Sequence, residues 1–187
     1  MCVLCYLSTD RELAPIPFDE TDRQLNLEVN ETRPACLTRR YVYYCGSQER
    51  CGCGFLKAEL PEPLWKQTWK ELRSGALSPE TAFGWYEKHF MAPGSLTELE
   101  EEAGEYRLAC RAYRQLVDLI CETSEMGFDC ELLICWAGDE NLTPDYTYNL
   151  ELHRNELRFN FDTQDFDDES NGQNNDCVRL YRIGAVL

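Results

Sequence analysis

The sequence predicts an α+β domain: a mainly antiparallel sheet of about six strands, with a long amphipathic helix packed on one face and two shorter helices. Strand-like segments lie towards both ends of the chain, whereas apolar residues at helical spacing fill its middle. Hydrophobic residues make up 43% of the 187 residues, which is enough for a substantial core. We therefore expect residues 1–187 to form a single domain.

The expected strands are short segments bounded by turn residues. Residues 2–8 and 130–137 are continuous apolar runs, which are typical of buried strands. The other expected strands, rich in β-branched, aromatic or alternating apolar residues, are 24–29, 41–45, 146–152, 157–161 and 177–183. A tight turn at Arg154-Asn155 predicts a hairpin between 146–152 and 157–161. We expect the first strand, the strand from Tyr41 and the last strand to be neighbours.

Three helices are expected between residues 62 and 126. The long one begins at Thr97, which forms a capping box with Glu100, and ends near Gly127. Its apolar stripe consists of Leu99, Ala103, Tyr106, Cys110, Tyr113, Val117 and Ile120. The two shorter helices span about 62–73 and 78–90, the second opened by Ser78 and Pro79.

The charge of the chain restricts its partners. It has 34 acidic and 18 basic residues, for a formal net charge of −16. This charge argues against nucleic acid and against an anionic membrane surface, since both require a surplus of lysine and arginine. The negative electrostatic field of the molecule would attract a basic protein as its partner.

Cysteine usage predicts a reducing compartment. The 11 cysteines are an odd number, and the first residues lack the basic segment and the long apolar run of a secretory signal. No stretch approaches the length of a membrane span. We therefore expect a cytoplasmic protein with free thiols rather than a disulfide framework.

The chain concentrates sulfur and glycine between Tyr41 and Phe55. A strand ending at Cys45 is followed by Gly46, and then by Cys51-Gly52-Cys53-Gly54. Thiolates bind zinc-type metals, and glycine allows the backbone to turn tightly around such a site. The N-terminal pair Cys2 and Cys5 could complete the ligand set, although an extended segment would point them to opposite faces. The predicted metal ligands are therefore Cys51, Cys53, Cys45, Cys2 and Cys5, with zinc as the expected cofactor.

Several other interpretations stay open. The cysteines could simply be buried as small apolar residues. The protein could instead be a non-enzymatic, immunity-type protein that covers a basic partner. A third option is a cysteine-dependent enzyme, in which His89 or His153 would activate Cys51 or Cys53. The sequence does not indicate a substrate.

The acidic stretch 162–176 offers one further metal pattern. Part of it has the spacing of a calcium-binding loop, but Val178 stands where the bidentate glutamate is required. We expect a solvated loop there. Phosphate-binding, serine-nucleophile and zinc-protease motifs are absent from the sequence.

Overall fold

A computed structural model describes the parts of the chain that carry most of the predicted elements. The described residues are 2–58, 74–75, 96–150, 157, 159, 164–165, 175–176 and 178–185.

Six strands form one mixed, mostly antiparallel sheet in the order β2-β3-β1-β4-β8-β5. The strands are β1 (Val3–Thr9), β2 (Asn26–Val29), β3 (Tyr41–Gly46), β4 (Cys130–Trp136), β5 (Tyr146–Leu150) and β8 (Arg179–Ile183). Neighbouring strands are antiparallel except β5 and β8, which are parallel. The predicted fold class is confirmed.

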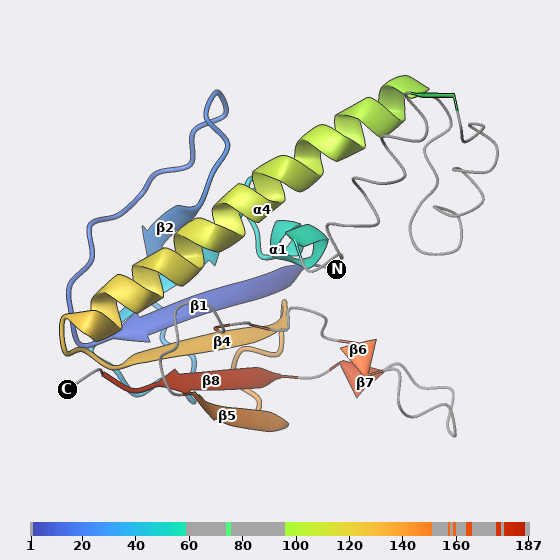
Figure 1. Ribbon diagram of the computed structural model, residues 1–187. Coiled ribbons are helices and arrows are strands. Elements are labelled where there is room, and N and C mark those ends of the chain that lie inside the picture. Colours follow the sequence, from blue (N-terminus) through green and yellow to red (C-terminus); the bar gives the residue numbers. More distant parts are fainter. Residues whose placement is uncertain are drawn as a thin grey trace.

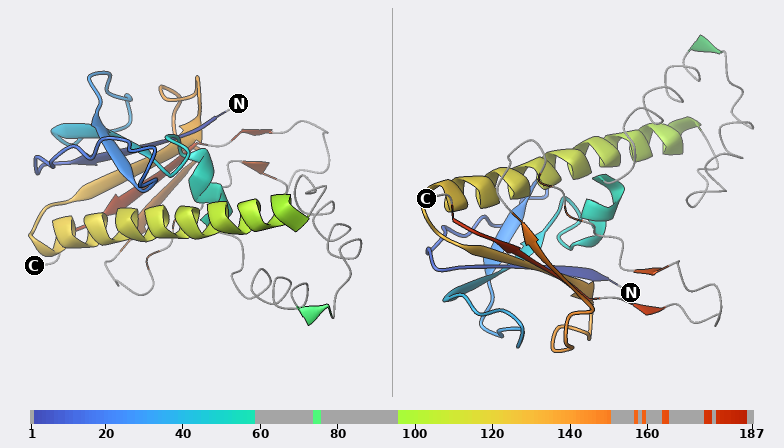
Figure 2. Two further views of the ribbon diagram at one scale, coloured as in Figure 1. Left: turned by 90° about the horizontal axis from the view of Figure 1, so that it is seen from above. Right: turned by 60° about the horizontal axis from the view of Figure 1, so that its bottom comes forward.

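The long helix α4 (Leu96–Glu125) lies across one face of this sheet (Figures 1 and 2). Val3, Cys5 and Leu7 of β1 share one buried cluster with Leu116 and Ile120 of α4. The intervening Tyr6 belongs to a second cluster, on the other face of the sheet. This separation follows from the two-residue period of a strand, which points successive side chains to opposite faces.

The end of α4 follows the glycine signal in the sequence. Gly127 has φ +87° and donates a backbone hydrogen bond to Ser124, so it closes the helix in the left-handed conformation that glycine adopts without strain. The chain then enters β4, which lies next to β1 at the centre of the sheet.

The structure corrects three expectations about the arrangement of the elements. The first strand and the Tyr41 strand are neighbours, but the last strand β8 is separated from them by β4. A short helix, α1 (Cys53–Ala58), follows the glycine-rich turn, where no helix was expected. Within the acidic stretch, two short strands, β6 (Gln164–Asp165) and β7 (Asn175–Asp176), pair antiparallel, where a loop without strands was expected.

Other expectations fall partly or wholly outside the described residues. The two shorter predicted helices, 62–73 and 78–90, lie wholly outside the described residues. The hairpin partner of β5 is described only at Leu157 and Phe159, both buried. Within the described residues, β5 pairs with β8, and the hairpin stays a prediction.

The face of the sheet opposite α4 contains a buried carboxylate. Glu131 of β4 is 1% exposed, and its register neighbours on the two adjacent strands are Ser8 and Arg182. It accepts hydrogen bonds from the Ser8 hydroxyl at 3.0 Å, the Thr38 backbone N–H at 2.6 Å and the Thr38 hydroxyl at 2.9 Å. The carboxylate thereby joins the loop before β3 to the central strands.

Candidate functional site

The loop from Gly46 to Gly54 connects β3 to α1 and carries the cysteine–glycine cluster. It is closed by backbone bonds from Ser47 N–H to the Cys51 carbonyl and from Arg50 N–H to the Ser47 carbonyl, both 2.9 Å long. The Ser47 hydroxyl also donates to the Cys51 carbonyl, at 2.6 Å. The loop therefore has a fixed shape determined mainly by its own hydrogen bonds.

At two positions of this loop a side chain would clash with neighbouring atoms, so glycine is required there. The backbone dihedral angles do not themselves require glycine. A Cβ atom at Gly52 would lie 2.8 Å from the backbone oxygen of Val3. A Cβ atom at Gly54 would overlap the side chains of Ser47 and Gln48, which are fully buried. Neither glycine has positive φ, so the tight turn expected from these glycines does not depend on a left-handed glycine conformation.

The left-handed residue of the loop is Arg50, with φ +63°. An L-residue with a side chain is strained in this conformation, whereas glycine is not. The Arg50 side chain is 65% exposed and lies 3.6 Å from Glu28, so it contributes little through this ion pair.

Replacing Arg50 by glycine is therefore expected to raise the free energy of unfolding by about 1 kcal/mol, because it removes the left-handed strain. Urea denaturation followed by circular dichroism would measure the change. Arg50→Lys, which keeps both the charge and the strain, should leave stability unchanged. A glycine variant less stable than the parent protein would contradict this interpretation.

The loop is docked on the beginning of β1. Gly52 N–H donates to the Val3 carbonyl at 3.0 Å, and Val3 N–H donates to the Cys53 sulfur at 3.1 Å. Cys2, immediately before β1, donates a thiol hydrogen bond to the Cys53 sulfur. The N-terminus accordingly lies beside α1 in Figure 1. Cys2, Cys51 and Cys53 thus form one group, which we call the thiol cluster.

Within the thiol cluster, the pKa values of the half-buried Cys51 and Cys53 shift in opposite directions. A hydrogen bond from the Cys53 thiol to the Cys51 sulfur lowers the pKa of Cys51 to about 7, although burial opposes this shift. The same hydrogen bond, reinforced by burial, raises the pKa of Cys53 far above its ordinary value. Cys53 consequently keeps its proton near neutral pH, while a large fraction of Cys51 is thiolate.

The other two predicted ligands, Cys5 and Cys45, form a separate buried pair. Both are fully buried in the core between the sheet and α4. Burial, followed by the hydrogen bond with Cys45, raises the pKa of Cys5 well above its ordinary value. The side chains of the five predicted ligands are therefore placed as one cluster of three and one core pair.

No group of three or more histidine, cysteine, aspartate or glutamate side chains has metal-holding geometry within the described part of the chain. The zinc site stays a prediction. His89 and His153, the candidate bases of the enzyme hypothesis, lie outside the described residues.

Buried polar side chains beneath the loop are functional candidates that sequence reasoning missed. The Asn26 amide donates to the Ser47 carbonyl at 2.8 Å. Gln48 is fully buried, and within the described structure neither atom of its amide has a hydrogen-bond partner. The Gln48 carbonyl accepts a bond from Arg23 at 3.1 Å, and Arg23 forms a two-bonded ion pair with Glu105 of α4. The sequence shows that residues before Cys51 are polar, but no local pattern indicates that Gln48 is buried.

Tyr44 approaches the thiol cluster from β3. Its hydroxyl donates to the Arg50 carbonyl at 3.5 Å. Burial raises the pKa of Tyr44, and the nearby Cys51 adds to this shift. The tyrosine therefore stays neutral beside the Cys51 thiolate.

Comparison with protein families, with curated proteins and with solved structures found no match for this chain. None of the described helices combines the length and apolar character required to cross a membrane.

Proposed function

We propose that the thiol cluster is a regulatory cysteine-thiolate site in which Cys51 is the reactive sulfur. The observation that carries the proposal is the hydrogen-bonded arrangement of Cys51, Cys53 and the backbone of Val3. A thiol with a pKa near the ambient pH is well suited to attack disulfides, because much of it is ionised without losing its nucleophilicity.

The proposed reaction is thiol–disulfide exchange with a small-molecule disulfide. The Cys51 thiolate attacks one sulfur, a new S–S bond forms at Cys51, and the original S–S bond breaks. The departing sulfur leaves as a thiolate and takes a proton from solvent. A thiol reductant reverses the exchange by the same chemistry. A reducing, cytoplasmic compartment, as expected from the cysteine usage, would keep Cys51 free at rest.

Alkylation with iodoacetamide at a series of pH values tests this proposal. The rate at Cys51 is expected to rise with a midpoint near pH 7, as more thiolate forms, and to level off above it. Cys53→Ala removes the hydrogen-bond donor and should move the midpoint towards about 8.5, the value of an ordinary thiol. Mass spectrometry of the cysteine peptides follows each residue separately.

The matched control is Cys36→Ala, which removes a half-buried thiol from the opposite face of the sheet and should leave the Cys51 midpoint unchanged. A Cys51 midpoint near that of an ordinary thiol in the parent protein would sink the proposal. With oxidised glutathione, Cys51 should be the first of the described cysteines to form a mixed disulfide.

Zinc binding is the second candidate function, because thiolate sulfur is a donor that zinc prefers. The three sulfurs would have to rearrange around the metal, since within the described residues they do not have metal-holding geometry. A structural zinc site requires four ligands, so a further group would have to join Cys2, Cys51 and Cys53. One equivalent of zinc would then protect Cys51 and Cys53 from iodoacetamide. Unchanged labelling after the addition of zinc would leave thiol exchange as the function of the cluster.

A further inference from the structure

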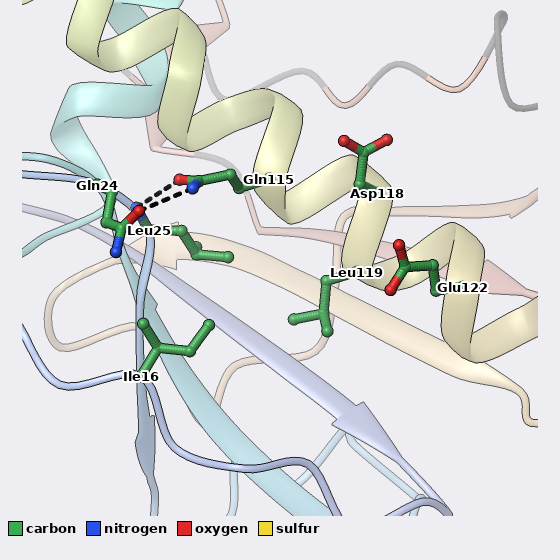
Figure 3. Close-up of a pocket in the computed structure, with 7 residues that line it drawn as sticks. All are labelled: Ile16, Gln24, Leu25, Gln115, Asp118, Leu119 and Glu122. Atoms are coloured by element: carbon green, nitrogen blue, oxygen red, sulfur yellow. Dashed lines mark hydrogen bonds between the residues drawn. The ribbon is translucent and has the colours of Figure 1, made fainter.

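A groove of about 260 Å³ lies between α4 and the segment that leads into β2 (Figure 3). Its lining combines three apolar side chains with two amides and two carboxylates: Ile16, Leu25, Leu119, Gln24, Gln115, Asp118 and Glu122. The groove is formed by residues outside the thiol cluster, so its role is independent of the proposed thiol chemistry.

The shape of the groove is fixed by hydrogen bonds at one end. Gln115 donates its amide N–H to the Gln24 side chain at 2.9 Å and accepts a bond from the Leu25 backbone at 3.1 Å (Figure 3). Ile16 is held by paired backbone bonds with Leu27 of β2. The apolar part of the lining is therefore anchored to both the sheet and α4 before any ligand binds.

Two exposed carboxylates line the α4 side of the groove. Asp118 and Glu122 are four residues apart on the helix, a spacing that places side chains on the same side. Among the described residues, neither carboxylate has an ion-pair or hydrogen-bond partner. The nearby Arg111 is already paired with Asp22 at 2.7 Å and also donates to Gln24.

We infer that this groove binds an arginine side chain from a basic segment of a partner protein. The methylene groups of arginine would lie on Ile16, Leu25 and Leu119, while the guanidinium would reach Asp118 and Glu122. Long cationic side chains bury their stems and keep their charged ends at the surface, which matches an apolar floor with an acidic edge. Arginine fits better than lysine, because its planar fork can donate to two carboxylates together.

The size and charge of the molecule support the same partner. Drug-sized ligands occupy pockets of about 300–1,000 Å³, so this groove suits a single long side chain. The net charge of −16 attracts a basic segment over a longer range and accelerates its association. Contacts outside the groove would supply the remaining affinity.

Titration of the full chain with an arginine hexapeptide tests this inference, with a citrulline hexapeptide as the neutral control of similar shape. In methyl-labelled protein, the largest NMR shifts are expected at Ile16, Leu25 and Leu119. The double variant Asp118→Asn with Glu122→Gln should weaken binding about fivefold, as expected for two surface charge pairs. Both side chains are exposed, so the fold should tolerate the change.

The charge-matched control is Glu31→Gln with Glu101→Gln, which removes two exposed carboxylates outside the groove lining. It should weaken binding less than twofold, since it changes only the overall field. Equal weakening by both double variants, equal binding of the citrulline peptide, or shifts spread away from the groove would each overturn the inference. The inference is supported if the control variant still binds the arginine peptide while the groove variant binds it more weakly.

Discussion

Replacing Glu131 by alanine is expected to lower the free energy of unfolding by about 3 kcal/mol, because several hydrogen-bond donors would lose their acceptor in a buried place. The Ser8 hydroxyl, the Thr38 backbone N–H and the Thr38 hydroxyl all donate to this carboxylate. Arg182 also approaches it, at 3.5 Å. A loss of this size is a large part of the 5–15 kcal/mol by which a typical domain is stable.

Glu131→Gln separates charge from shape. It keeps the volume, but its amide N–H₂ group would face the donors that now bind the carboxylate, so much of the loss should remain. Ser8→Ala removes one donor and should cost about 1 kcal/mol. Chemical denaturation measures all three variants. An alanine variant within 1 kcal/mol of the parent would show that the carboxylate does not stabilise this face.

Replacing Gly52 by alanine is expected to have the next largest effect, a loss of about 2 kcal/mol, with a simultaneous loss of the low Cys51 midpoint. The added methyl would lie 2.8 Å from the Val3 carbonyl, a backbone atom that cannot move without shifting β1. Displacement of the loop would break the Gly52–Val3 and Val3–Cys53 hydrogen bonds, which position the Cys53 thiol next to Cys51.

Gly104→Ala is the matched control for this effect. A Cβ atom at Gly104 meets no atom within 4 Å, so alanine there should stabilise α4 by up to about 1 kcal/mol. Denaturation and the pH series of iodoacetamide labelling measure both variants. A Gly52→Ala protein with normal stability and a midpoint near pH 7 would refute the role given to this contact.

Local sequence patterns predicted most of the elements, because those patterns depend on a few neighbouring residues. The capping box at Thr97 and the glycine at position 127 located both ends of α4 closely. The continuous apolar run at residues 2–8 predicted the buried strand β1. The short helix α1 was missed, since its six residues are too few to show a helical period and glycine is its second residue.

The candidate site could be predicted only in part. The concentration of cysteine and glycine drew attention to residues 45–54, but the grouping of sulfurs depends on strand pairing between distant segments. In the observed register Tyr6 faces Tyr44, which places Cys5 beside Cys45 in the core and leaves Cys2 at the beginning of β1. Neither this register nor the position of β4 between β1 and β8 is encoded by a local pattern.

The central place of β1 has a consequence for synthesis of the chain. β1 is synthesised well before β4, one of its two partners, and the Ser8–Glu131 contact spans 123 residues. Until β4 emerges, the nascent chain carries an apolar strand with an unpaired edge. Such high contact order slows folding and leaves β1 exposed to aggregation until its β4 partner is available.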